Sequence, residues 1–357
     1  MKHLVLNRLA ATKIRRVRQL SFPGQVLVAQ GQSVHPEDRI AEAELPTEIY
    51  TLDIAKGLRI DPSEVVSCLV RNLGQELAQD DVLAECEGTL ARLVRVPLAG
   101  KLLACWDGVA FIAAGKRKVT VRAEMIGVVS TILPARGAIL ATQGSLIQGV
   151  WGNGSVGAGV LRSQTSELEK AITPEELKEI DEGQVIAVGF CSNQALLDRM
   201  VEKKPTGLIL GSLRPDLMSF VAALSFPVIL LGGFGELPPD HHTFQLLREK
   251  SGDVVCLNAC QPDHLDGIWP EVMVPSSLGD PQSTWPFQAE IKLGQRVQVL
   301  SGAERGGVYT VVGLPKEKAT LESGLTSEVA VLTPEEGEEM MVPRENFVIL
   351  GIENKGL

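Results

Sequence analysis

One short sequence pattern occurs twice near the start of the chain, and it constrains the fold more than any other feature. Residues 31–43 read GQSVHPEDRIAEA, and residues 74–86 read GQELAQDDVLAEC. In both copies a Gly-Gln pair precedes an apolar residue, a polar turn that contains Asp, and an alternating apolar run that includes Ala-Glu. This pattern predicts a strand, a tight turn and a second strand. We therefore expect residues 1–125 to form a β-rich domain in which the two hairpins are halves of one core.

The order of these residues resembles a known β module. The hairpin pattern is followed by P-x-x-G-K-L at residues 97–102. Over residues 17–115 this order is similar to the barrel-sandwich hybrid of biotinyl and lipoyl domains and of efflux adaptor proteins. The resemblance implies a compact β module, and carrier domains of this family present a modified lysine at a hairpin tip. Neither hairpin has a tip lysine, and Lys101 lacks the flanking residues of a carrier site, so we expect no attached cofactor.

The chain is acidic overall but basic at its start. A formal net charge of −10 disfavours general binding to nucleic acid or to anionic membranes. Residues 1–36 nevertheless contain no acid, and their basic residues are Lys2, Arg8, Lys13, Arg15, Arg16 and Arg18. This stretch can contact a phosphate or an acidic partner, or it can be the solvated face of a strand. We take Arg15, Arg16 and Arg18 as candidate interface residues.

Length and residue usage are typical of a multidomain globular protein. With 357 residues, 45% of them hydrophobic, the chain can bury two or three cores. No apolar run reaches the length of a membrane helix, and residues 1–20 lack the apolar block of a signal peptide. We therefore expect no membrane insertion and a cytoplasmic location. Six cysteines without a framework spacing predict free, buried thiols.

Residues 126–162 form a glycine-rich β segment. Six glycines lie between positions 144 and 159, so the backbone there either adopts positive φ or approaches a neighbour closely. The spacing from Gly152 formally contains G-x-G-x-x-G, but no helical pattern follows it, as a dinucleotide-binding loop would require. We expect a structural loop, with Trp151 as a candidate anchor at a subunit interface. Residues 163–183 read as a linker that ends in a capped helix at 175–181.

Residues 184–275 are predicted to form an α/β domain with a parallel sheet. Apolar runs at 185–190, 207–211, 227–232 and 253–259 alternate with helical patterns at 194–203, 216–224 and 241–250. A ligand would bind at the carboxyl ends of these strands. The candidate ligand-binding residues at those ends are Ser192, Asn193, Ser212, Arg214, Gly233, Gly235 and Glu236.

These strand ends offer no catalytic constellation. Ser212 is preceded by Leu-Gly and lacks the nucleophile elbow of hydrolases. The spacing of Cys256, Cys260 and His264 is the best metal pattern, but it has no fourth ligand, and the first cysteine lies within a strand. We therefore predict no catalytic residue, no metal and no cofactor.

Residues 288–352 resemble an SH3-like barrel of the KOW type. The resemblance rests on a G-x-x-V-x-V-x-x-G entry at 294–302, a G-x-V strand that starts at 306 and a closing V-P-x-x-N that starts at 342. Many such domains bind RNA or RNA polymerase, but acidic residues outnumber basic ones in this copy. Phosphate binding depends on basic charge, so protein docking fits it better.

Taken together, these features predict a multidomain fold with a barrel-sandwich-like start, a parallel α/β centre and a terminal β barrel. Compact modules without a catalytic group favour a non-enzymatic scaffold subunit that binds protein partners and forms homo-oligomers. One alternative is a small-anion or nucleotide site, or an enzyme, at the strand ends of the α/β domain. The other is nucleic-acid association through the basic start and the terminal barrel.

Overall fold

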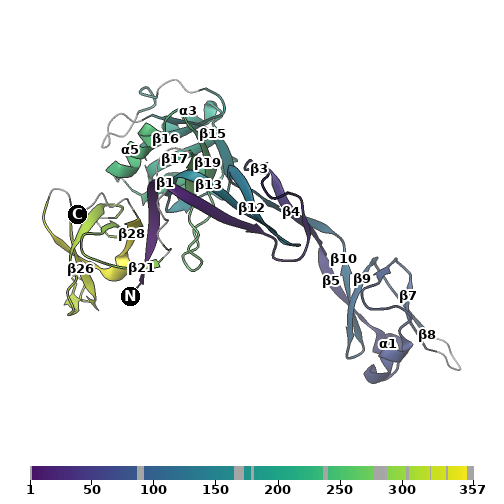
Figure 1. Ribbon diagram of the computed structural model, residues 1–357. Helices are drawn as coiled ribbons and strands as arrows, with labels where there is room; N and C mark the ends of the chain where they lie inside the picture. Colours follow the sequence, from purple (N-terminus) through teal and green to yellow (C-terminus); the bar gives the residue numbers. More distant parts are fainter. Residues whose placement is uncertain are drawn as a thin grey trace.

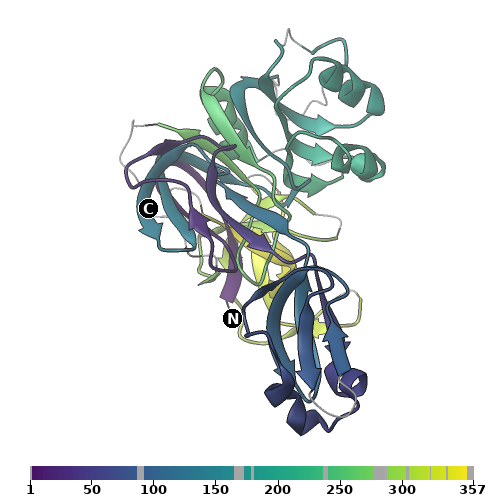
Figure 2. The same ribbon diagram turned by 90° about the vertical axis from the view of Figure 1, so that its right-hand side faces the viewer.

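The computed structural model describes residues 2–86, 92–164, 173–177, 181–235, 240–276, 286, 288–302, 305–321, 323–334 and 337–351. The chain is β-rich, and many of its strands join one large mixed sheet. Residues 48–114 extend away from the rest as a separate lobe in both views (Figure 1; Figure 2). We call residues 48–114 the arm and the remainder the body.

The first strand, β1 (Lys2–Gln19), runs through two parts of the body. Its start pairs with β21 (Gln288–Glu290) and, in parallel, with β28 (Phe347–Gly351). From Arg8 onward it pairs antiparallel with β13 (Gly137–Gln148). The first residues of the predicted 1–125 domain therefore pack with the C-terminal strands, and Val5 lies in their core.

The two hairpins lie in different cores, which corrects the expectation that they are halves of one. Val34 and Ile40 of the first hairpin pack in the body against Leu140. Leu77 and Leu83 of the second pack inside the arm. The physical reason is the path of the chain, which enters the arm after β4, leaves it before β11, and pairs these two strands antiparallel. The strands of the first hairpin and its neighbours are β2 (Gln25–Val26), β3 (Ser33–Val34), β4 (Arg39–Leu45), β11 (Arg117–Arg122) and β12 (Gly127–Leu133).

The Gly-Gln pair of each hairpin forms the same turn. Gly31 and Gly74 have φ of 82° and 84°, in the left-handed region that favours glycine. The side chain of the glutamine that follows each glycine folds back, and its Oε1 accepts a hydrogen bond from the backbone amide three residues earlier. The N···O distances are 2.9 Å from Ala29 to Gln32 and 3.1 Å from Asn72 to Gln75. We call this the Gly-Gln turn. The same hydrogen bond occurs at two further pairs, which contain Gln184 and Gln295.

The arm is a four-stranded antiparallel sheet with a short hairpin and helical turns packed on one face. Its core consists of Ile54, Leu58, Leu102, Ile112 and other apolar residues of the arm alone. Its elements are β5 (Glu48–Asp53), α1 (Ile54–Leu58), η1 (Pro62–Glu64), α2 (Val65–Cys68), β6 (Glu76–Leu77), β7 (Val82–Cys86), β8 (Arg92–Arg95), β9 (Gly100–Trp106) and β10 (Val109–Ala114). The sheet order is β5-β10-β9-β6.

The predicted strands and helices between residues 184 and 275 are present. Strands β15 (Val156–Ser163), β16 (Gln184–Cys191), β17 (Gly207–Leu213) and β18 (Val228–Phe234) are parallel neighbours. The fourth predicted run, β19 (Val254–Asn258), instead pairs antiparallel with β15 and with β20 (Glu271–Pro275). The parallel part of the sheet is therefore completed by a strand from the glycine-rich segment.

Both faces of this sheet are buried. Helices α3 (Gln194–Glu202) and α4 (Met218–Ala222), with η2 (Pro215–Leu217), pack on one face. Helix α5 (His241–Glu249) and side chains of β13 and β20 pack on the other. Burial on both faces explains why these strands are almost continuously apolar.

The glycine-rich segment serves close backbone packing. A Cβ at Gly152, in β14 (Trp151–Gly152), would lie 2.3 Å from the carbonyl oxygen of Ala259, and one at Gly149 would lie 2.5 Å from that of Leu230. The G-x-G-x-x-G stretch leads into strand β15, as its lack of a helical pattern predicted. In the linker, Pro174–Glu176 form a turn rather than the start of a helix, and residues 178–180 lie outside the described ranges.

The last part of the chain is a small antiparallel sheet that curves around its own core. Its order is β28-β22-β23-β26-β27, and β1 continues it beyond β28. The remaining strands are β22 (Arg296–Val299), β23 (Val308–Gly313), β24 (Ala319–Thr320), β25 (Thr326–Ser327), β26 (Val329–Thr333) and β27 (Met340–Pro343), with η3 (Arg344–Asn346) before β28.

Candidate functional site

The predicted ligand-binding residues at the strand ends are mostly engaged in local structure. The Oδ1 of Asn193 accepts the amide hydrogen of Leu196 at 2.8 Å and caps α3, while Ser192 contacts the Asn193 amide. Ser212 is fully buried beside Gly233 of β18. Arg214 is exposed and forms a two-point ion pair with Asp216. Glu236 lies outside the described residues.

The end of β18 is covered by an arginine from the C-terminal sheet. Gly233 and Gly235 have φ of 118° and 116°. The guanidinium of Arg305 lies 5.7 Å from the ring centre of Phe234, and Trp151 packs edge-on against the same ring. Burial raises the pKa of the nearby Cys191 thiol to about 12, so this thiol is a poor nucleophile. Ligand binding here, and an interface role of the half-buried Trp151, stay predictions.

The candidate interface arginines divide into two groups. Arg15 is exposed on the outside of β1, whereas Arg16 and Arg18 turn toward a cleft on the other face. Arg16 Nε donates to Glu271 Oε2 at 2.9 Å, and its Nη2 contacts Glu271 Oε1. Arg18 Nη2 lies 3.3 Å from Glu124 Oε2. Two cationic side chains of the basic start are therefore committed to carboxylates, which weakens the case for nucleic-acid binding through this segment.

The floor of this cleft is a row of polar side chains across four neighbouring strands. Gln148 of β13 lies opposite Glu271 of β20, which lies opposite Asn258 of β19. Asn7 of β1 stands next to Gln148 and donates to its Oε1 through both its backbone amide and its side chain. Each of the four residues is 5% or 6% exposed. We call Asn7, Gln148, Glu271 and Asn258 the polar row.

Hydrogen bonds join the polar row to the arginines. Gln148 Nε2 donates to Glu271 Oε1 at 2.9 Å. At the other end, Asn258 Nδ2 donates to Glu124 Oε2 at 3.2 Å. The same Glu124 oxygen therefore accepts from Asn258 and forms the ion pair with Arg18. The row thus carries one buried carboxylate and three amides, with Arg16 at Glu271 and Arg18 near Asn258 through the shared Glu124.

A segment that follows β19 forms the opposite wall of the cleft. Cys260, Gly267, Ile268 and Trp269 line it, and the cleft has a volume of about 370 Å³. Burial, aided by the carboxylates of Glu271 and Glu124, raises the pKa of the Cys260 thiol to about 11 and keeps it neutral. The indole Nε1 of Trp269 is buried and makes no hydrogen bond within the described part of the chain.

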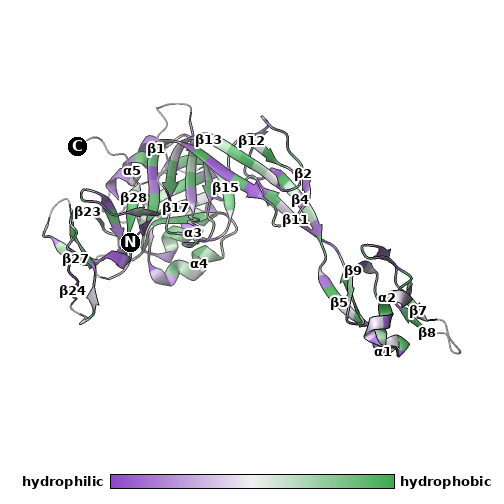
Figure 3. Cartoon of the chain, turned by 60° about the horizontal axis from the view of Figure 1, so that its bottom comes forward, coloured by the Kyte–Doolittle hydropathy of each residue, from purple (hydrophilic) through white to green (hydrophobic). Residues whose placement is uncertain are grey.

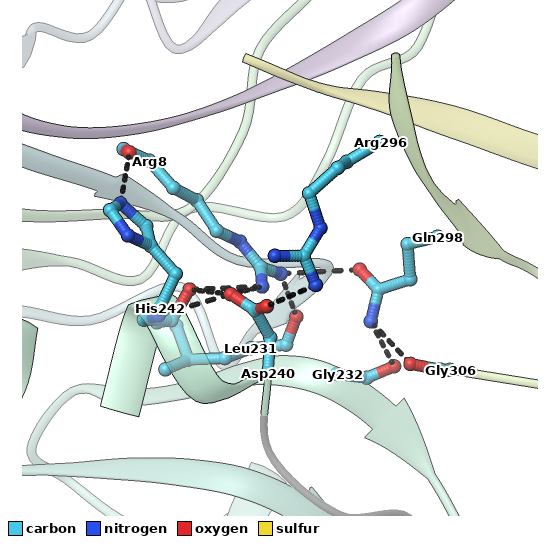
Figure 4. A network of polar contacts seen from close by, with 9 residues as sticks. Arg8, Leu231, Gly232, Asp240, His242, Arg296, Gln298 and Gly306 are labelled. Carbon is cyan, nitrogen blue, oxygen red and sulfur yellow. Dashed lines mark hydrogen bonds and ion pairs between the residues drawn. The ribbon is translucent and has the colours of Figure 1, made fainter. Parts of the chain in front are cut away.

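A second polar cluster joins β1, α5 and the C-terminal sheet (Figure 4). The Arg8 guanidinium is fully buried and lies 3.3 Å from Asp240 Oδ2. It also donates to the carbonyl of Leu231 and to Gln298 Oε1. Burial acts to raise the pKa of Asp240, but the Arg8 charge, the hydrogen bonds from Thr243 and the Arg296 charge together lower it. Because Arg8, Asp240 and Gln298 have buried side chains, this cluster acts as a structural junction.

The arm presents an apolar sheet face on the side opposite its core. In the sheet, Ile49 pairs with Ala113, and Val109 pairs with Trp106. These rows alternate with rows whose side chains enter the arm core. Trp106 is 75% exposed and Ile49 is 58% exposed. Figure 3 shows hydrophobic and hydrophilic segments interleaved along the arm. We call Ile49, Trp106, Val109, Phe111 and Ala113 the outer face.

Sequence reasoning identified neither the polar row nor the outer face. Asn258 and Glu271 are each the one polar position of an otherwise apolar strand, whereas Asn7 and Gln148 lie in strands with several polar residues, so the available signal was partial. All six cysteines are free, and no three His, Cys, Asp or Glu side chains within the described ranges gather as metal ligands. The described helices include none long and apolar enough to cross a membrane. The sequence matches no family model and no curated protein.

Proposed function

We propose that this protein is a non-enzymatic scaffold subunit that assembles with copies of itself through the outer face of the arm. The observation that carries the proposal is the exposure of Trp106 and Ile49 on a sheet face whose other side is already a complete core. Monomeric proteins rarely leave such contiguous apolar surface in water, and exposed patches mark interaction sites. Aromatic side chains are enriched at the centres of such interfaces.

The charges around the outer face support a second copy of the chain as its occupant. Lys101 and Glu76 lie in one row with Ile49 and Ala113, and Asp53 lies in one row with Val109 and Trp106. A two-fold contact places the same patch on both sides, so it requires an apolar centre with charges of both signs at its rim. A groove of about 450 Å³, lined by Lys101, Glu76 and other residues, lies at the root of this face and can receive side chains of the second copy.

The oligomeric state tests this proposal directly. Size-exclusion chromatography with light scattering is expected to show a dimer or larger assembly, and Trp106→Asp is expected to shift it to a monomer. A matched control is Leu325→Glu, because Leu325 is 69% exposed on the C-terminal sheet and should leave the assembly intact. A wild-type protein that stays monomeric up to its solubility limit would overturn the proposal.

A further inference from the structure

We propose that the cleft above the polar row binds a small organic monocarboxylate. The cleft has a volume of about 370 Å³, within the range of small-molecule sites. It lies in the body, away from the outer face of the arm, and binding there does not depend on self-assembly.

The floor of the cleft retains polar side chains where apolar ones would fit. Two residues further along the same strands, on the same face, the corresponding row is Leu146, Met273 and Cys256, which are all buried. Burying amides and a carboxylate is costly compared with such packing, even when they are hydrogen-bonded. The sheet therefore accepts apolar residues at this depth, yet the polar row lies there and lines the cleft.

The cleft carries two guanidinium and two carboxylate groups, and we expect it to accept one further negative charge only where a guanidinium is incompletely held. Glu271 holds Arg16 through both of its oxygens, so this pair is saturated. Arg18 is held less completely, by the carbonyl of Ala123 at 2.8 Å and by one oxygen of Glu124, which is more exposed and is shared with Asn258. A ligand carboxylate can take over the Arg18 side of this contact. A multiply charged phosphate would carry additional negative charge beside the carboxylates of Glu271 and Glu124, which would repel it.

The donors that remain in the cleft require a ligand with acceptor oxygens. Trp269 lines the cleft, and its buried Nε1–H has no hydrogen-bond partner among the described residues. Arg18 Nη2 is ion-paired with Glu124 but makes no hydrogen bond of good geometry to any described residue. An unpaired buried donor costs about 1–3 kcal/mol, so an acceptor that reaches it gains affinity. Val17, Leu146 and Ile268 line the same space and provide contacts for a short carbon skeleton.

The test uses isobutyrate as the probe and isobutyramide, of the same shape, as the uncharged comparison. The indole N–H resonance of Trp269 is followed by NMR during titration, and Trp269→Phe assigns it by deleting the peak. Isobutyrate is expected to shift this resonance with a dissociation constant on the order of 1 mM, as suits a ligand of few atoms. Isobutyramide is expected to bind at least about tenfold more weakly, since it lacks the charge that Arg18 attracts.

Two variants and one control locate the site. Arg18→Gln is expected to weaken isobutyrate binding at least about tenfold, which is the effect of losing one charge-assisted contact. Trp269→Phe keeps the ring, removes only the donor, and should weaken binding by a smaller factor, measured by calorimetry. Arg15→Gln, on the exposed face of the same strand, should bind as the wild type does. The proposal fails if isobutyrate does not bind, if the amide binds equally well, or if inorganic phosphate competes as strongly as isobutyrate. It also fails if Arg15→Gln is affected as much as Arg18→Gln.

Discussion

The body and the arm are built from the same hairpin pattern, yet they are held together in different ways. The parts of the body are joined by a polar junction, in which Arg8 contacts residues more than 200 positions away in the sequence. The arm buries only its own apolar residues and continues into the body through strands β4 and β11. We therefore expect the body to unfold as one unit, whereas the arm can lose its structure alone. This independence suits a part that serves as a contact surface.

The largest effect is expected from breaking the junction of the body. Arg8→Met should lower the free energy of unfolding by about 3–5 kcal/mol, because it leaves the buried Asp240 with the more distant Arg296 as its ion-pair partner among the described residues. Urea unfolding followed by circular dichroism measures the loss. Lys13→Met, on the exposed face of the same strand, is the control and should have little effect.

A double substitution sharpens this prediction. Arg8→Met combined with Asp240→Leu removes both charges, and it should recover part of the stability that Arg8→Met alone loses. If the double variant loses more free energy of unfolding than the two single variants lose in sum, the junction does not depend on the charge pair.

A cavity in the arm core should affect the arm and leave the body unchanged. Leu102→Ala removes a fully buried side chain and should destabilise the arm by about 3 kcal/mol. Hydrogen exchange is expected to show faster exchange in β9 and β10 but not in β16 and β17. Faster exchange in both places would show that the arm and the body are one cooperative unit.

Acid should weaken the body through Asp240. The pKa of Asp240 is lowered in the folded protein, so its contribution is present above the pKa of an unfolded Asp, about 3.9, and is lost as pH falls through the lower folded value. The loss should be smaller than that caused by Arg8→Met, because a neutral Asp240 keeps Thr243 as a partner. Unfolding of wild type and Asp240→Asn between pH 5 and pH 2, in steps of about 0.5, checks this expectation. A wild type that loses no more stability than the variant would contradict it.

The sequence predicted local elements better than the contacts between them. The strands of the α/β part were predictable because burial on both faces requires continuous apolar runs, and the hairpins because a Gly-Gln pair favours a left-handed turn. Gly31 pairs with β12 and not with the arm. This pairing joins residues about a hundred positions apart in the sequence, and no local pattern specifies it. The polar row was not predictable for the same reason. Asn7, Gln148, Asn258 and Glu271 are visible one by one, but their alignment requires the register of four strands.

The Gly-Gln turns provide the finest comparison, because the same bond stabilises the body at Gln32 and the arm at Gln75. Gln32→Ala and Gln75→Ala each remove one side-chain hydrogen bond and should cost about 1 kcal/mol. The glycine amides still donate across the sheet, to Val129 in the body and to Leu102 in the arm, so neither turn should be lost. Gln32→Ala should speed hydrogen exchange in β12 alone, and Gln75→Ala should speed it in β9 alone. Glu76→Ala, beside the second turn and exposed, is the control. Equal effects of either glutamine variant on both strands would mean that the two hairpins share a cooperative unit despite their separate cores.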